Sequence, residues 1–294
     1  MKINLVKNAA KRLYLKSRRA ATYNRRNQNM EQIQGGVTAA KGFEAAGVAA
    51  GIKYKDRMDM ALIYSTEPCN VAGTFTTNIV KAAPVLWDKE IVEKSPFAQA
   101  VVVNAGIANA CTGKQGMDYC HEEAKTVSKL LGIPENAVLV GSTGVIGMQL
   151  PIDRICAGIE KLAAQKDGSI EAGHIASKAI MTTDTVSKEI AVSFELDGKT
   201  VTLGGMCKGS GMIHPNMCTM LSYITTDAAI SKNLLQEALS ESIVDSYNMI
   251  SVDGDTSTND TCLLLANGLA GNTEIVQKGE AYDKFCEALQ MVNT

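Results

Sequence analysis

The sequence lacks any apolar stretch that could cross a membrane. Its longest ones, such as residues 45–52, fall far short of the ~20 residues that a transmembrane helix needs. No signal peptide precedes the eight cysteines and no two of them form a CxxC pair, which argues against a disulfide framework and against a metal–cysteine cluster. The three histidines also lack the spacing of metal ligands. We therefore expect a cytoplasmic protein with reduced thiols, no metal and no membrane contact.

Two ligand-binding patterns are missing as well. No GxxxxGK[ST] string is present, so nothing supports binding of a nucleoside triphosphate. The acidic segment 251–260, SVDGDTSTND, fails as a calcium loop: counted from Asp253, position 6 is Thr258 instead of glycine and position 12 is Leu264 instead of glutamate. Its acidic and hydroxyl side chains are expected to make hydrogen bonds within turns.

Charge is distributed unevenly along the chain. Residues 1–29 contain nine Lys or Arg and no Asp or Glu, which leaves 20 basic and 31 acidic residues from Met30 onward, a net charge of −11. A basic leader of this kind is typical of a mitochondrial transit peptide or of a nucleic-acid-binding arm. We favour a third reading, a non-native leader in which Arg25-Arg26 translates a ribosome-binding site before a start at Met30. Residues 1–29 are therefore excluded from the fold, and no nucleic-acid partner is expected.

The remaining chain has the composition of an ordinary globular protein. The full chain of 294 residues has 46% hydrophobic and 20% charged residues. Its length is sufficient for one large domain or two smaller ones. Asp197-Gly198 between two β-rich runs is the strongest hairpin signal. Strands are expected at residues 59–65, 72–75, 101–104, 138–140, 189–196, 199–203 and 217–224, and helices at 115–131, 153–165, 171–180, 231–247 and 281–291.

Residues 204–227 place one hydroxyl residue, Thr219, between a glycine-rich loop and an apolar strand. The glycines of the loop permit positive φ angles and let backbone N–H groups approach a ligand closely. A nucleophile at the start of a rigid strand would be well supported, so Thr219 is a candidate nucleophile. On pattern alone, the commoner interpretation of Thr219 is a β-branched residue of a core strand, and its spacing does not overturn that interpretation.

Five motifs, in order along the chain, give a more specific indication. They are GGVTAAKGFEAAGVAAGIK at 35–53, GSTGVIG at 141–147, MTTDT at 181–185, KGSGMIHPNMCTML at 208–221 and SVDGDTSTND at 251–260. Together they resemble the ornithine acetyltransferase (ArgJ) family, also called glutamate N-acetyltransferases, from about Gly35 to beyond Asn267. The resemblance implies an α/β (α+β type) protein: a four-layer αββα sandwich of the self-processing, N-terminal-nucleophile type, with an incomplete C-terminal lobe.

The resemblance also implies that the chain cleaves itself between Cys218 and Thr219. The products would be an α-chain of residues 30–218, preceded by any leader, and a β-chain of residues 219–294. Cleavage gives Thr219 a free α-amino group, whose pKa of ~7.7–8.0 suits a general base at neutral pH. Members of the family usually carry alanine before the threonine, so Cys218 is a departure that would at most slow processing.

Other site residues follow from matching motif positions. Thr143 and Gly144 match the oxyanion hole, whose donors are typically worth about 2.7–4 kcal/mol each to the transition state. Thr182 and Lys208, together with Thr219, match substrate-binding positions, and Asp184 is expected to hold its loop. Without the resemblance, Thr143-Gly144 would be only a turn and Lys208 a solvated lysine, and His214 is expected to pack its loop.

The activity implied is ping-pong acetyl transfer in arginine biosynthesis. Thr219 would take acetyl from N-acetylornithine and pass it to glutamate without a cofactor, although some members also accept acetyl-CoA. The partners implied are the α and β chains of the same precursor, as an αβ heterodimer that assembles into a heterotetramer. The chain ends at Thr294, before the family's last substrate-binding motifs. Three alternatives remain: a self-processing aminopeptidase-like hydrolase, an inactive truncated fragment, and, if residues 1–29 target the chain, a mitochondrial matrix enzyme.

Overall fold

The structure is a computed structural model that describes residues 30–212 and 220–294. Its strands are β1 (Met30–Ile33), β2 (Phe43–Val48), β3 (Met60–Phe75), β4 (Ala98–Ile107), β5 (Val138–Val145), β6 (Lys188–Leu196), β7 (Lys199–Lys208), β8 (Leu221–Thr226) and β9 (Thr261–Ala266). Its helices are α2 (Ala83–Lys94), α3 (Lys114–Leu131), α4 (Ile152–Gln165), α5 (Ile170–Ala179), α6 (Lys232–Val244) and α7 (Glu280–Asn293), with short 3-10 turns η2 (Glu135–Ala137) and η3 (Tyr247–Met249).

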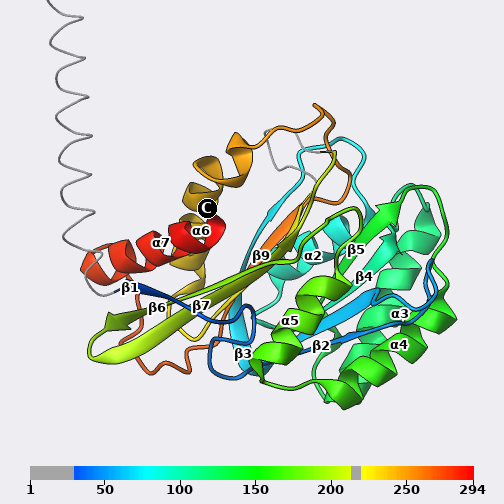
Figure 1. Ribbon diagram of the computed structural model, residues 1–294. Coiled ribbons are helices and arrows are strands. Elements are labelled where there is room, and N and C mark those ends of the chain that lie inside the picture. Colours follow the sequence, from blue (N-terminus) through cyan, green and yellow to red (C-terminus); the bar gives the residue numbers. More distant parts are fainter. Residues whose placement is uncertain (1–29, 213–219) are drawn as a thin grey trace, which may run out of the picture.

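The strands form two sheets that share the long strand β3 (Figure 1). The first half of β3 pairs with β2 and β4, and β5 extends this sheet in parallel with β4. The second half of β3, residues 70–75, pairs with β9 in the other sheet, which continues through β8, β7 and β6 to β1. The register shifts between Tyr64 and Cys69, where the chain passes from one sheet to the other.

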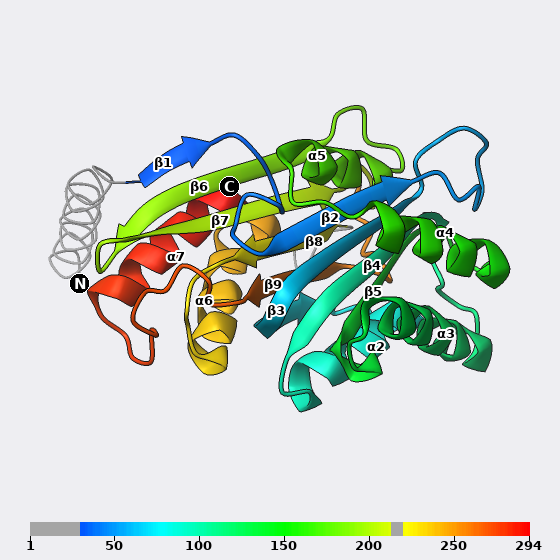
Figure 2. The ribbon, with the colours of Figure 1, turned by 90° about the horizontal axis from the view of Figure 1, so that it is seen from below.

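The two sheets face each other and helices cover their outer faces (Figure 2). Alternation along β8 shows how the sequence builds this arrangement: Leu221 and Tyr223 face the core between the sheets, whereas Ile224 faces the core under α6 and α7. A third core lies between helices α3 and α4 and the sheet formed by β2, β3, β4 and β5. The fold is therefore the expected four-layer αββα sandwich, because each sheet buries both of its faces.

Helix α2 covers the open edge of β5. The indole Nε1 of Trp87 donates to the carbonyl of Val138 at 2.9 Å, and a carboxylate oxygen of Asp88 accepts from the amide of Val140 at 2.8 Å. These two side chains supply two of the hydrogen bonds that a further strand would make at the start of β5, and α2 covers this part of the edge. None of the helices in the described ranges is both long and apolar enough to span a bilayer.

Most elements predicted from the sequence are present, but one prediction is wrong and four elements, β1, β2, β9 and α2, were not predicted. The hairpin at Asp197-Gly198 is confirmed: both residues have positive φ angles, 52° and 71°, between β6 and β7. The expected strands at 59–65 and 72–75 are wrong as separate elements, because β3 runs unbroken from Met60 to Phe75 through the exposed residues 66–68. The sequence also gave no sign of α2, which begins with Pro84 in its first turn and has only a weak apolar face.

Candidate active site

Three segments that are far apart in the sequence meet at one end of the two sheets. They are the end of β5 with Thr143 and Gly144, the loop before β6 with Asp184, and the loop that leaves β7 at Lys208. The ammonium group of Lys208 donates to the hydroxyl oxygen of Thr143 at 3.3 Å. Both side chains are buried, Lys208 with 3% and Thr143 with 5% of its surface exposed. The structure thus brings together two of the residues that the sequence motifs had singled out.

Lys208 is a buried cation rather than the solvated lysine of the alternative interpretation. Burial lowers its pKa below the ordinary value of a lysine, and the neighbouring charge of Lys188 acts in the same direction. The carboxyl groups of Asp184 and Asp260 oppose this shift. A positive charge held in a site that excludes water attracts a carboxylate more strongly than one on the surface does.

Asp184 joins the loop before β6 to the loop after β7. Its Oδ1 accepts from the ammonium of Lys188 at 2.6 Å and from the amide of Gly209 at 2.8 Å, and Oδ2 accepts from the amide of Thr182 at 3.4 Å. Burial alone would raise its pKa, but the hydrogen bonds from Lys188 and Gly209 and the charges of Lys208 and Lys188 outweigh burial and lower the pKa. Asp184 is therefore a carboxylate that holds its own loop, as expected, and also the loop after β7.

Gly144 lies where no other residue fits. Its φ is +133°, and a Cβ atom added there would lie 2.2 Å from the carbonyl carbon of Gly106, its partner across the parallel β4–β5 ladder. The close approach of two backbones at the ends of β4 and β5 needs glycine on conformational and on steric grounds. The segment around Gly106 is thus structurally coupled to the Thr143-Gly144 turn.

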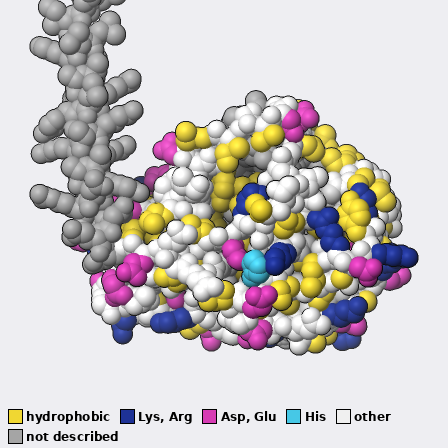
Figure 3. Space-filling model, in the orientation of Figure 1, with side chains coloured by type: hydrophobic (Ala, Val, Ile, Leu, Met, Phe, Trp, Pro, Cys, Tyr) yellow, Lys and Arg dark blue, Asp and Glu magenta, His cyan; other side chains and the backbone are white. Residues whose placement is uncertain are grey.

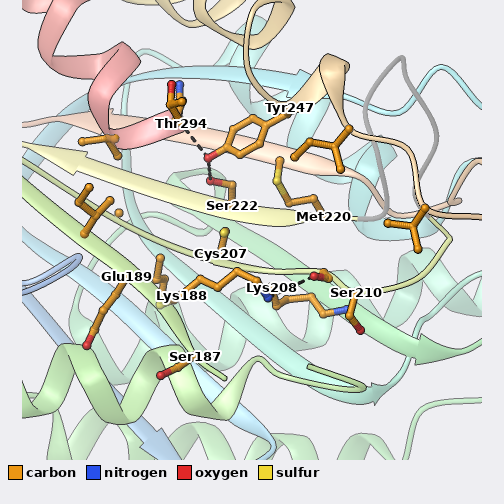
Figure 4. A pocket seen from close by; sticks show the side chains of 18 residues that line it. Ser187, Lys188, Glu189, Cys207, Lys208, Ser210, Met220, Ser222, Tyr247 and Thr294 are labelled. Carbon is orange, nitrogen blue, oxygen red and sulfur yellow. Dashed lines mark hydrogen bonds between the residues drawn. The ribbon is translucent and has the colours of Figure 1, made fainter. Parts of the chain in front are cut away.

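A cavity of about 530 Å³ opens beside these loops (Figure 3). Its walls combine apolar side chains such as Met206, Met220 and Ile250 with the polar groups of Lys208 and Ser222. Figure 4 shows Lys188 and Lys208 extending along one side of it, with Ser222 and Tyr247 on another. The complete lining is Ser187, Lys188, Glu189, Ile190, Gly205, Met206, Cys207, Lys208, Gly209, Ser210, Met220, Ser222, Tyr247, Ile250, Val252, Val292, Asn293 and Thr294.

The candidate nucleophile Thr219, the cleavage residue Cys218 and the loop residue His214 lie outside the described residues. The described residues on both sides of this segment border the same cavity: Ser210 before it and Met220 after it. Ser210 Oγ lies 2.5 Å from Thr183 Oγ1. Described residues on both sides of segment 213–219 therefore lie at the cavity.

Thr182 occupies a less central place. Its carbonyl and that of Met181 accept from the guanidinium of Arg57 at 2.9 and 2.7 Å, and its side chain is not among those that line the cavity. Arg57 was not singled out in the sequence, because a lone arginine in a loop carries no motif. Its contact with a loop 125 residues away appears only in the fold.

Two more residues at the site were missed. Asp260 accepts from the amide of Met220 at 3.0 Å, and Asn259 donates to the carbonyl of Ser142 at 2.8 Å. Burial raises the pKa of Asp260 to about 8, although hydrogen bonds from Met220 and Ser257 and the charge of Lys208 act against the shift. Both residues belong to SVDGDTSTND, which had been interpreted as a set of local turns.

Known proteins share first the fold of this chain and then, more specifically, its family. A Burkholderia β-aminopeptidase is similar over 90% of this chain and 87% of its own, at a TM-score of 0.54 and 13% identity, which is a likeness of fold alone. A model of the ArgJ family matches residues 44–294. The chain therefore belongs to the ArgJ family.

Curated relatives agree with this assignment. The arginine biosynthesis bifunctional protein ArgJ 1 of Clostridium acetobutylicum is 54% identical over 257 residues, which cover 87% of this chain and 62% of that protein. The ArgJ protein of Symbiobacterium thermophilum is 53% identical, with 90% of this chain and 65% of that protein covered. The chain thus spans less than two thirds of the length of these relatives.

Two solved structures are similar over a shorter part of the chain. ArgJ from Bacillus halodurans superposes with a TM-score of 0.60 and 43% identity over 66% of this chain and 98% of that one. Ornithine acetyltransferase from Mycobacterium tuberculosis, solved in complex with ornithine, gives a TM-score of 0.59 and 37% identity over 65% of this chain and 100% of that one.

Proposed function

We propose that this chain transfers an acetyl group from N-acetylornithine to glutamate through an acyl-enzyme on Thr219, as a step of arginine biosynthesis. The observation that carries the proposal is the 3.3 Å hydrogen bond from Lys208 to Thr143, at a site that the chain enters and leaves on either side of Thr219. Membership of the ArgJ family and the ornithine bound to the M. tuberculosis relative support the choice of substrate.

The hydrogen bond also supports a role for Thr143 in this proposal. An ammonium group has three donors and no acceptor, so Thr143 Oγ1 must accept from Lys208. The hydroxyl proton of Thr143 is then free to be donated elsewhere. Beside a backbone N–H of Gly144, it would serve as the second donor to the oxyanion of a tetrahedral intermediate.

The reaction then needs a base on the nucleophile. Cleavage between Cys218 and Thr219 would free the α-amino group of Thr219, which takes the proton from its own Oγ as Oγ attacks the acetyl carbonyl. Collapse of the intermediate breaks the amide bond and returns that proton to the leaving amine of ornithine. Glutamate then attacks the ester by the reverse sequence. In this scheme Lys208 meets a substrate carboxylate, and acetyl-CoA is an alternative acetyl donor.

Assembly and location complete the proposal. The α-chain of residues 30–218 and the β-chain that starts at Thr219 would stay together as an αβ heterodimer, since β7 and β8 lie on opposite sides of the cleavage point and pair along six residues. Such heterodimers would associate into a heterotetramer in the cytoplasm.

The test is the intact mass of the purified protein beside a Thr219→Ala variant. Two fragments that join at Cys218 and Thr219, absent from the variant, are expected. Incubation with N-acetylornithine labelled in its acetyl group should then give labelled N-acetylglutamate when glutamate is present. Release of labelled acetate at the same rate with and without glutamate would contradict transfer and favour an aminopeptidase-like hydrolase. An uncut chain without either product would leave the inactive-fragment alternative.

A further inference from the structure

Asn259 and Asp260, which precede β9, make hydrogen bonds to both segments of the proposed active site, the turn after Ser142 and the strand that follows Thr219. The side-chain amide of Asn259 donates to the carbonyls of Ala108 and Ser142, at 2.6 and 2.8 Å. The carboxylate of the next residue, Asp260, accepts from the amide of Met220 at 3.0 Å. Ser142 directly precedes Thr143, and Met220 directly follows Thr219.

We propose that Asn259 and Asp260 are positioning residues that fix the spacing between the nucleophile segment and the oxyanion turn. This inference rests on the proposed function, because it assigns the two segments their roles. Neither side chain is placed on a reacting atom. Since the two residues are adjacent in the chain, a rigid dipeptide sets the distance between elements that are otherwise far apart in the sequence.

The orientation of Asn259 is determined by its partners. Thr258 Oγ1 lies 2.5 Å from Asn259 Oδ1, and two carbonyl oxygens surround Nδ2, which only an NH₂ group can satisfy. The amide of Ala108 in turn donates to the carbonyl of Val145 at 2.9 Å. Asn259 therefore joins the ends of β4 and β5 beside the turn that contains Gly144.

Asp260 holds Met220 from a fully buried position. The carbonyl of Met220 accepts from the amide of Thr261 at 3.0 Å, so the residue after Thr219 is fixed through both its N–H and its C=O. Oδ2 of Asp260 has no hydrogen-bond partner among the described residues, and the side chain has no exposed surface. The amide of Met220 therefore requires a hydrogen-bond acceptor at this position, and a neutral oxygen would also serve as that acceptor.

Geometry of this kind affects the rate more than binding. Catalytic groups need to be held within roughly 0.5 Å of their productive positions, and a displacement of about 1 Å can lower the rate about 100-fold. Loss of either contact should therefore reduce kcat by about ten- to a hundredfold. For Asn259 KM should stay nearly unchanged, because Asn259 neither lines the cavity nor contacts Lys208. Asp260 holds Met220 in the cavity wall and acts on the charge of Lys208, so its loss should raise KM as well.

The matched control for Asn259 is Asn272. It is also buried, with 7% of its surface exposed, and its side chain also makes three hydrogen bonds: it accepts from the amide of Ala229 at 2.9 Å and donates to the carbonyls of Ala229 and Thr273 at 3.1 and 2.8 Å. It does not line the cavity. Asn272→Ala should therefore reproduce the loss of a buried amide without moving the site.

The experiment compares kcat, KM and amide hydrogen exchange in the wild type, Asn259→Ala, Asn272→Ala, Asp260→Ala and Asp260→Asn. The expected result is a lower kcat with an unchanged KM for Asn259→Ala, a kcat near wild type for Asn272→Ala, and a higher kcat for Asp260→Asn than for Asp260→Ala. Asparagine keeps the oxygen acceptor, so it should rescue the alanine variant in part.

Hydrogen exchange separates this inference from the proposed function. Asn259→Ala should speed exchange in residues 106–109 and 141–145, and Asp260→Ala should speed exchange at Met220, while Asn272→Ala leaves all three unchanged. Equal losses of kcat in Asn259→Ala and Asn272→Ala, or unchanged exchange at these segments, would overturn the inference. A wild type without acetyl transfer would refute the proposed function, and exchange alone would then decide whether the pair holds the two segments.

Discussion

The ammonium of Lys208 and the hydroxyl of Thr143 meet across 65 residues of sequence, at a separation of 3.3 Å, with both side chains buried. This contact joins the loop that leads toward Thr219 to the turn at the end of β5. In the proposed mechanism, a lysine on one sheet thereby directs the proton of a hydroxyl on the other. The proposed mechanism therefore requires that the two sheets be held together at this point.

The variant Lys208→Met should show that Lys208 acts in the reaction and does not merely stabilise the fold. Methionine fills a similar volume but cannot donate to Thr143 or attract a carboxylate, so kcat/KM for acetyl transfer should fall about 100-fold or more. The free energy of unfolding should change little or rise, because a buried cation is expensive to desolvate. Steady-state kinetics and urea unfolding at pH 7 measure the two effects.

The pH dependence of this stability difference has a defined sign. The pKa of Lys208 is lowered in the folded state, so the protonated form is disfavoured there and wild-type stability should rise as the pH approaches the unfolded value near ~10.4. The advantage of Lys208→Met should accordingly shrink between neutral pH and pH ~10. The exposed Lys199 at the other end of β7 provides the control, and Lys199→Met should alter neither rate nor stability. A rate loss equal to that of Lys199→Met would contradict the role given to Lys208.

Gly144→Ala should be among the most damaging single changes in the chain. Both the φ of +133° and the 2.2 Å approach to Gly106 oppose a Cβ atom, and the nearest atoms belong to the backbone of Gly106 and Ile107 and cannot rotate away. We expect a loss of about 4 kcal/mol or more in the free energy of unfolding, the range of exceptional substitutions. Thermal and urea unfolding give the measurement.

Gly147→Ala is the matched control. Gly147 lies three residues further along with a φ of +83°, but nothing lies within 4 Å of an added Cβ. It should lose only the ~1–2 kcal/mol that a left-handed conformation costs an L-residue. Similar losses for the two variants would mean that the contact between Gly144 and Gly106 is not tight.

Local elements of the fold were predictable because their signals are local. The Asp197-Gly198 turn and the apolar periodicity of α3, α4 and α7 each follow from neighbouring residues. The edge contacts of Trp87 and Asp88 with β5 were not predictable, since they depend on where a helix without a strong pattern comes to rest. The αββα order of layers came from the resemblance to a family, which periodicity alone could not supply.

The site shows the same division. Thr143, Gly144 and Lys208 were selected because their motifs resemble those of a family, and the fold then brought them together. Asn259 was passed over because its segment also satisfies ordinary turn hydrogen bonds, such as the one from its own amide to Ser257 Oγ at 3.0 Å. Its contact with Ala108 spans 151 residues, and no rule of local spacing reports such a contact.

Glu123 should make the protein less stable as the pH rises. The side chain is fully buried in α3, its two carboxylate oxygens have no hydrogen-bond partner among the described residues, and burial together with the nearby Asp88 raises its pKa to about 8. The folded state therefore binds this proton more tightly than the unfolded state does. Its contribution to stability is complete below about pH 4.5 and is lost as the pH rises to about 8.

Glu123→Gln tests this dependence, because glutamine keeps the shape and cannot ionise. Near pH 5 the variant and the wild type should have similar free energies of unfolding, and by pH 8.5 the variant should be more stable by roughly a few kcal/mol, at about 1.4 kcal/mol for each unit of pKa shift. Glu122→Gln, at the exposed neighbouring position, should follow the wild type at every pH. Parallel curves for Glu123→Gln and the wild type in urea unfolding would show that Glu123 ionises as freely in the folded protein as in the unfolded chain.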